Sequence, residues 1–153
     1  MTTVSFVVPG RIRGQARPRF TVKSGHAIAF TDSKTRSDAA MIRSFAMDAM
    51  AGRKLLEGPL KLEVKMWQQT PKSWSKKRKA AAVYVTGKPD CSNKIKGLED
   101  AMNRIVYADD SQIAIINFVR VYTTDPERVE VSVTELLSEW IPHKIEQRDL
   151  IPA

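Results

Sequence analysis

Leu60–Trp67, with the sequence Leu-Lys-Leu-Glu-Val-Lys-Met-Trp, alternates apolar and charged side chains. Successive side chains of a β-strand point to opposite faces, so this pattern is typical of a strand with one buried face. Gly58-Pro59 directly before it marks a turn. The stretch therefore predicts a half-buried strand.

The chain before this strand predicts a strand, a hairpin and a helix. Val4–Val8 reads as a short strand that ends at Pro9-Gly10, and Phe20–Val22 with His26–Thr31 forms a hairpin around Lys23-Ser24-Gly25. A helix is expected over residues 33–51, capped by Asp32 or Ser33 and stopped by Gly52. Three- and four-residue steps mark its buried stripe as Ala39, Ile42, Phe45, Ala46 and Ala49.

The chain after this strand predicts two helices and two strands. Lys76–Val83 reads as a short helix, and Ser92 or Asn93 caps a second helix that runs to Asn103. Strands are expected over residues 113–122 and 129–137. Ile95, Leu98 and Met102 are the inward positions of the second helix. This order predicts an α+β fold: a single small domain with a mixed, largely antiparallel sheet packed by helices.

Charge and cysteine content restrict the class of protein. The 153 residues include 25 Lys and Arg against 17 Asp and Glu, a net charge of +8, which suggests a polyanion as partner, with nucleic acid as the first candidate. A basic solvated surface without a partner fits this composition about equally well. The single cysteine, Cys91, excludes an intramolecular disulfide and fits a reducing compartment. No apolar run reaches the roughly 20 residues of a membrane span, so we expect a cytoplasmic protein without membrane contact.

The residues best suited to chemistry lie in Lys88–Lys96 and at Asp109-Asp110. Carboxylates among many positive charges are what a metal-dependent nuclease needs, because acidic oxygens hold a divalent cation and basic side chains hold phosphates. Lys96 and Asp100 share a helix face with Ser92. The alternative is an ordinary surface ion pair between Lys96 and Asp100, with Asp109-Asp110 in a solvated turn.

Three motifs in order resemble the RusA-type Holliday junction resolvases. They are Lys88-Pro89-Asp90-x-x-Asn93-x-x-Lys96, Glu99–Asn103 (Glu-Asp-Ala-Met-Asn) and Val106–Ile113 (Val-Tyr-Ala-Asp-Asp-Ser-Gln-Ile). In addition, Gly14–Thr21 (Gly-Gln-Ala-Arg-Pro-Arg-Phe-Thr) resembles the phage-encoded branch of the family. The resemblance predicts a RusA-like endonuclease domain over residues 1–138 and a C-terminal tail over residues 139–153.

The resemblance implies a homodimer that nicks two strands of a four-way DNA junction symmetrically during recombination and repair, with Mg²⁺ as cofactor and Mn²⁺ as a substitute. Asp90 and Asp110 correspond to metal ligands, and together with Lys96 they form the implied catalytic set. Asn93, Asp100 and Gln112 are implied supporting residues. Asp109 is a further candidate ligand.

One position departs from the family pattern. The family usually reads Pro-Asp-x-Asp-Asn, whereas this chain has Ser92 in place of the second, metal-binding Asp. A hydroxyl is a weaker ligand, which can hold the metal through a water. Asp109 or Asp100 can substitute for the missing carboxylate; otherwise the site is inactive, or the protein binds branched DNA without cutting it.

Basic residues in two segments are candidates for DNA contacts. A single residue of this kind is typical of a solvated surface, but the two sets together favour binding to phosphates. Trp67 and Trp74 are expected to pack in the fold rather than stack on bases. The candidates are Arg11, Arg13, Arg17, Arg19 and Lys23 in the first set, and Lys72, Lys76, Lys77, Arg78 and Lys79 in the second.

Three functions remain open at this stage. The leading one is a junction-resolving endonuclease, and the second is a non-cleaving protein that binds branched DNA. The third is a nuclease that acts on flaps or forks.

Overall fold

A four-stranded mixed sheet forms the centre of the molecule. The computed structural model describes residues 1–15, 19–30 and 33–136. The strand order is β1-β6-β4-β5, with antiparallel pairs except for parallel β4 and β5. The predicted α+β class with a mixed, largely antiparallel sheet is confirmed. The strands are β1 (Thr3–Pro9), β4 (Leu60–Gln69), β5 (Ile113–Thr123) and β6 (Arg128–Glu135).

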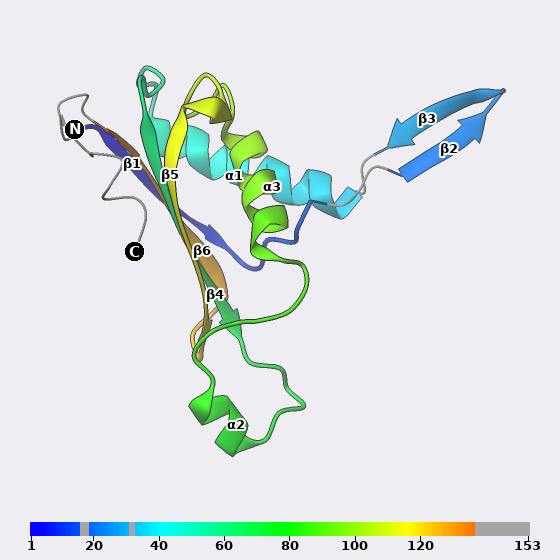
Figure 1. Ribbon diagram of the computed structural model, residues 1–153, viewed down its shortest axis with the longest axis vertical. Helices are drawn as coiled ribbons and strands as arrows, with labels where there is room; N and C mark the ends of the chain where they lie inside the picture. Colours follow the sequence, from blue (N-terminus) through cyan, green and yellow to red (C-terminus); the bar gives the residue numbers. More distant parts are fainter. Residues whose placement is uncertain (16–18, 31–32, 137–153) are drawn as a thin grey trace, which may run out of the picture.

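Two helices cover one face of the sheet, as Figure 1 shows: α1 (Ser33–Met50) and α3 (Cys91–Met102). The alternation in β4 sends Leu60, Leu62 and Val64 into the core beneath them, where each is at most 3% exposed. The predicted stripe of α1 is confirmed. Ile42 and Ala46 are buried in the core, and Ala39, Phe45 and Ala49 pack against it.

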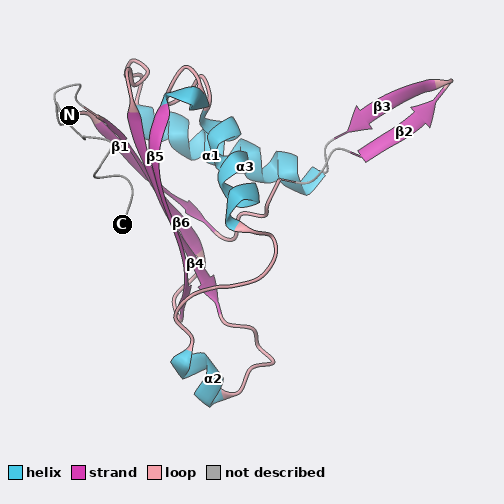
Figure 2. Cartoon of the chain, in the orientation of Figure 1, coloured by secondary structure: helices cyan, strands magenta, loops and turns pink. Residues whose placement is uncertain are grey.

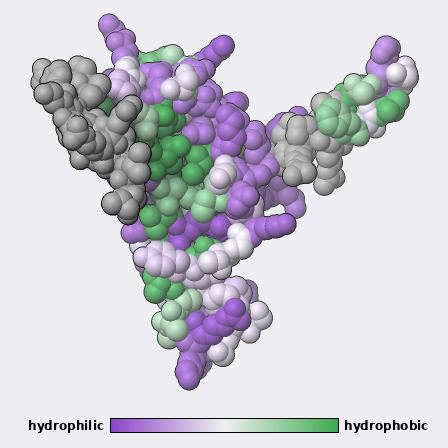
Figure 3. All heavy atoms as spheres, viewed as in Figure 1, coloured by the Kyte–Doolittle hydropathy of each residue, from purple (hydrophilic) through white to green (hydrophobic). Residues whose placement is uncertain are grey.

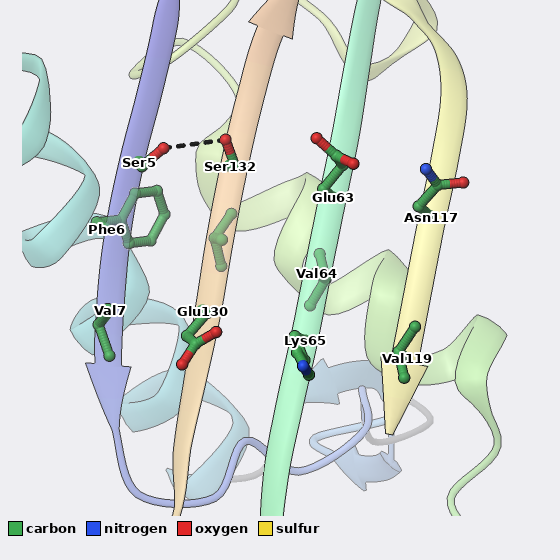
Figure 4. A pocket seen from close by; sticks show the side chains of 11 residues that line it. Ser5, Phe6, Val7, Glu63, Val64, Lys65, Asn117, Val119, Glu130 and Ser132 are labelled. Atoms are coloured by element: carbon green, nitrogen blue, oxygen red, sulfur yellow. Dashed lines mark hydrogen bonds between the residues drawn. The ribbon is translucent and has the colours of Figure 1, made fainter. Parts of the chain in front are cut away.

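Among the described residues, no helix lies on the opposite face of the sheet. Its centre is a shallow trough of about 550 Å³ that crosses all four strands. Figure 4 shows its side chains, and the hydroxyl oxygens of Ser5 and Ser132 lie 2.9 Å apart across β1 and β6. One face of the sheet is therefore covered by α1 and α3, while the other has an open trough at its centre. The candidate motifs belong to the face that α1 and α3 cover.

The parallel pairing of β4 and β5 requires a crossover, which places the candidate motifs. The chain leaves β4, forms the short helix α2 (Lys76–Ala81), pairs Tyr84 with Val121 of β5, and enters α3 (Figure 2). After α3, the 3₁₀ turn η1 (Asp110–Gln112) leads into β5. α3 thus runs toward the end of the sheet where β5 begins, and η1 lies between the two (Figure 1).

The predicted hairpin consists of β2 (Arg19–Lys23) and β3 (His26–Phe30). Its turn places Ser24 and Gly25 at φ values of 54° and 79°, as a type I′ turn requires. The ribbon extends away from the sheet in Figure 1. Phe20 and Val22 on it are 73% and 74% exposed.

Two predictions for α3 are wrong. Its N-cap is Asp90 rather than Ser92 or Asn93, because the Asp90 side chain accepts a hydrogen bond from the backbone N–H of Asn93. Of its predicted inward positions, Leu98 and Met102 are buried as expected, but Ile95 is only partly buried, and Lys94, 3% exposed, is buried instead. The pattern was misread because a lysine was not expected in a core.

Some predictions lie outside the described residues. They are the proposed cap Asp32, the basic residue Arg17, and the tail from residue 137 onward. The division into residues 1–138 and 139–153 therefore stays a prediction. None of the described helices combines the length and apolar character needed to cross a membrane.

Replacing Leu62 by Ala should test the central role of β4. Leu62 is fully buried between β5 and β6, so its truncation should lower the free energy of unfolding by about 2–5 kcal/mol. Lys65→Ala, on the open face of the same strand, should cost less than about 1 kcal/mol. Urea unfolding followed by circular dichroism measures both, and equal losses would contradict this packing.

Candidate active site

Asp90 stands where the crossover loop becomes α3. Its Oδ1 accepts the backbone N–H of Asn93 at 2.9 Å, so the carboxylate caps the helix and compensates its unpaired N–H groups. The second carboxylate oxygen receives no hydrogen bond from the described part of the chain. Because Asp90 is exposed, that oxygen faces solvent at the N-terminus of the helix.

Lys96 lies between two carboxylates. Its Nζ is 2.7 Å from Oδ2 of Asp110 and 3.0 Å from Oδ1 of Asp100, one turn further along α3. The hydrogen bonds to Asp110 and then Asp100 raise the pKa of Lys96 above its ordinary value. Lys96 therefore stays protonated at neutral pH, and its charge links α3 to the turn before β5.

The adjacent residues Asp109 and Asp110 have different surroundings. Asp109 caps η1 by accepting the backbone N–H of Ser111 at 2.9 Å, and its hydrogen bonds with Ser111 lower the pKa of its carboxyl. Asp110 instead contacts Lys96. Of the two, Asp110 is the one that forms an ion pair with α3 in the described part of the chain.

Gln112 fixes this turn through one side-chain amide. Its Oε1 accepts the backbone N–H groups of Ala108 and Asp109 at 2.9 and 3.2 Å, and its Nε2 donates to the carbonyls of Leu56 and Gly58. With the Asp109 cap, it completes a capping box. The Asp109-x-x-Gln112 spacing is a sequence signal for this arrangement, and it places Asp110 by fixing the backbone on both sides of it.

Arg120 holds the loop before Asp90, a role the sequence reading missed. It belongs to β5, is 8% exposed, and its guanidinium donates to the carbonyls of Gly87 and Pro89, both at 3.1 Å. Its own carbonyl accepts the N–H of Val85 at 3.0 Å. No local pattern reveals this contact, because Arg120 lies some thirty residues beyond the loop and looks like any charged residue of a strand.

The loop of residues 11–15 packs against α3 and the residues before it. A Cβ on Gly14 would lie 2.1 Å from Oδ1 of Asn93 and 2.8 Å from Cβ of Pro89, so only glycine permits this approach. Gln15 donates to Asp100 through Nε2 at 3.0 Å. Asn93, an implied supporting residue, thus packs under the loop rather than facing solvent.

Lys94 anchors the same loop from below. Its Nζ donates to the carbonyl of Ile12 at 2.6 Å, and it forms no ion pair within the described residues. Burial, followed by the charges of Arg120 and Arg11, lowers the pKa of Lys94 to about 8. Burying the charge of a lysine with only a carbonyl as partner costs free energy. What the hydrogen bond provides in return is a fixed backbone position for Ile12 in the loop.

The donor chemistry of the site suits a hard divalent cation. Asp100 and Asp110 carry two negative charges against the one positive charge of Lys96, and Asp90 lies at the start of the same helix without a contact to these three among the described residues. Mg²⁺ binds through one or two carboxylates, several waters and substrate phosphates, and Asp90 and Asp110 each keep a carboxylate oxygen that the described chain leaves without a hydrogen bond. Among the described residues, no three Asp, Glu, His or Cys side chains form a metal cluster by themselves.

The candidate DNA-binding residues have diverse surroundings. Arg11 forms a bidentate ion pair with Glu127 through bonds of 2.6 and 3.2 Å, and Nε of Arg13 lies 3.8 Å from Asp38. Arg78 lies over the ring of Trp74, which packs edge-on against Tyr122. Lys79 donates to the carbonyl of Lys72. The exposed members are Arg11, Arg13, Lys23, Lys72, Lys76, Lys77 and Arg78, while Arg19 lies in β2.

Two comparisons with known proteins bear on this site. A family model described as Endodeoxyribonuclease RusA matches residues 9–134, which include every residue of the site. The chain is also similar to the Bacillus subtilis (strain 168) protein described as "Uncharacterized protein YqaN", with 32% identity over 142 residues, 89% of this chain and 99% of that protein.

Replacing Arg120 by Met should loosen the loop before Asp90. The change removes the donor of two carbonyl hydrogen bonds and should cost about 1.5–3 kcal/mol of unfolding free energy. Amide hydrogen exchange should accelerate in residues 85–93 before it does so elsewhere. The matched control is Arg128→Met in β6, whose guanidinium instead binds Glu130 and lies over Trp67. If the two variants have the same exchange pattern, Arg120 does not hold the loop.

Proposed function

Because this chain belongs to the RusA endodeoxyribonuclease family, we propose that it resolves four-way DNA junctions by paired symmetric nicks, as a Mg²⁺-dependent homodimer in the cytoplasm. One observation carries the proposal: Lys96 is held between Asp100 and Asp110 on the helix that Asp90 caps. The site thereby combines acidic oxygens with a fixed positive charge. That combination suits hydrolysis of a phosphodiester.

Asp90 and Asp110 would hold the cation, with Ser92 contributing through a water. A bound Mg²⁺ would supply Lewis acidity at the scissile phosphate and activate water for attack. The capping bond from Asn93 fixes the Asp90 carboxylate, and Gln112 fixes the turn that carries Asp110. These supports reduce the freedom of both carboxylates before DNA arrives.

Lys96 would stabilise negative charge on the phosphate in the transition state. Its raised pKa keeps the proton on Nζ, so it acts as a fixed cation rather than as a general base. Asp100, which accepts bonds from both Lys96 and Gln15, orients the ammonium group. Asp100 is therefore a positioning residue in this scheme.

A homodimer follows from the reaction that we propose. A four-way junction has two-fold related strands, and paired nicks need two equivalent sites. One chain supplies one set of Asp90, Lys96 and Asp110. A second copy would supply the other.

A second candidate function rests on Ser92. It lies exposed in the first turn of α3, two residues after Asp90, where the family pattern has a carboxylate. With a hydroxyl there, the protein can bind branched DNA through its basic residues yet hold the cation too weakly to cut. This alternative is a junction-binding protein.

Cleavage of a labelled four-way junction tests the main proposal. The wild type should give two symmetric nicks with Mg²⁺ and none with a chelator. Asp90→Asn and Asp110→Asn should each slow cleavage at least about a hundredfold, because each removes a negative charge that holds the cation. Both variants should still bind the junction.

Asp48→Asn is the matched control, since Asp48 is exposed on α1 away from the site and the change removes the same charge. It should cleave at the wild-type rate. An intact junction at saturating wild-type protein would contradict the nuclease proposal. Preferred cleavage of flaps or forks in a substrate panel would contradict junction resolution in particular.

Ser92→Asp distinguishes the two candidate functions. A carboxylate in the first turn of α3 is favoured by the helix dipole and adds an oxygen ligand, so half-maximal cleavage should need about tenfold less Mg²⁺. An inactive wild type combined with an active Ser92→Asp variant would support the junction-binding protein. An unchanged Mg²⁺ requirement would show that residue 92 does not contribute to the metal site.

A further inference from the structure

A cleft between α1, α3 and the loop of residues 11–15 lies directly beside the candidate active site. Its volume is about 310 Å³. Three arginines line it: Arg13 from the loop, and Arg36 and Arg43 from α1. We call it the arginine cleft. Figure 3 shows hydrophilic side chains over the part of the molecule between the sheet edge and the hairpin, where α1 and α3 lie.

The lining of the arginine cleft carries three arginines but only two carboxylates, so its net charge is positive. The carboxylates that line it are Asp38 and Asp100. Asp38 accepts the backbone N–H of Arg13 at 2.9 Å, and Asp100 is bonded to Lys96 and Gln15. Within the described part of the chain, neither Arg36 nor Arg43 forms an ion pair, and both are exposed.

The two arginines of α1 are spaced along one side of the cleft. They are seven residues apart, which places them on one helix face about 10.5 Å apart along the axis. The long side chains of both arginines can therefore contact phosphates of a single strand that runs along α1.

The opposite wall of the cleft joins the active site. Gly97 and Asp100 of α3 line it, and Asp100 binds Lys96, which contacts Asp110. Gly97 adds no side chain to this wall, and the space above it is open, since a Cβ there would meet only the backbone N of Gln15, at 4.0 Å. A chain that lies in the cleft can therefore continue past α3 to Lys96.

We propose that the arginine cleft binds the phosphate backbone of one DNA strand and delivers an adjoining phosphodiester to Asp90, Lys96 and Asp110. Arg36 and Arg43 contact phosphates a few nucleotides from the nick, and Arg13 contacts the backbone where the strand turns toward α3. This inference rests on the proposed nuclease function and adds the path of the strand. The contacts are to phosphates, so they position DNA without reading its sequence.

The test is the double variant Arg36→Gln, Arg43→Gln, with a fluorescent four-way junction bound in the absence of divalent metal over a series of salt concentrations. The loss of two phosphate contacts should raise Kd roughly tenfold and reduce the slope of log K against log salt by about two. With Mg²⁺ and saturating junction, the rate of cleavage should change far less than Kd. Lys54→Gln, Lys65→Gln is the control, because it removes two exposed charges away from the cleft.

Neutral methylphosphonates in the junction then locate the contact. Replacing phosphates a few nucleotides from the nick should weaken the wild type and leave the double variant unaffected. If the double variant matches the control in Kd and slope while the wild type binds and cleaves, this inference is wrong and the proposed function stands. A wild type that fails to bind the junction overturns both, and circular dichroism with urea unfolding confirms that each variant is folded.

Discussion

The contact between Lys96 and Asp110 unites the two halves of the candidate site. It joins α3 to the turn before β5 across a distance of 2.7 Å, and Asp100 shares the same ammonium group. Lys96 is about half exposed, so the contact adds little to stability. Its importance is geometric: it places a positive charge between the carboxylates of Asp100 and Asp110, on the same helix that Asp90 caps.

The supports beneath this contact come from distant parts of the chain. Arg120 of β5 holds the loop before Asp90, and Gln112 holds the turn around Asp110. Lys94 binds the carbonyl of Ile12 and anchors the loop that brings Gln15 to Asp100. Two of these supports, Lys94 and Arg120, are buried cations bound to backbone carbonyls. Burying a charge costs free energy, and these hydrogen bonds hold loops in place rather than adding to the apolar core. The parallel pairing of β4 and β5 underlies this arrangement of supports. The crossover between two parallel strands must bring the chain back to the end of the sheet where both strands begin, and α3 is part of that crossover.

The sequence predicted what depends on local periodicity. The alternation in Leu60–Trp67 and the buried stripe through Ile42 and Ala46 were predicted correctly. A strand or helix with one face in the core has apolar residues at a period of 2 or 3.6, whatever the rest of the fold. The cap of α3 was predicted at the wrong residue, since Asp90, Ser92 and Asn93 are all good capping residues and only the folded structure shows which one accepts the N–H. The burial of Lys94 and the reach of Arg120 were missed for another reason. Both depend on carbonyls of segments remote in sequence, which no local pattern contains.

Anomalous scattering from a crystal of the wild type soaked in Mn²⁺ tests the central claim most directly. The account predicts one Mn²⁺ peak within coordination distance of carboxylate oxygens from both Asp90 and Asp110, with Lys96 beside it. A peak bound by only one of these aspartates, or a structure in which the two carboxylates lie too far apart to share an ion, would contradict it.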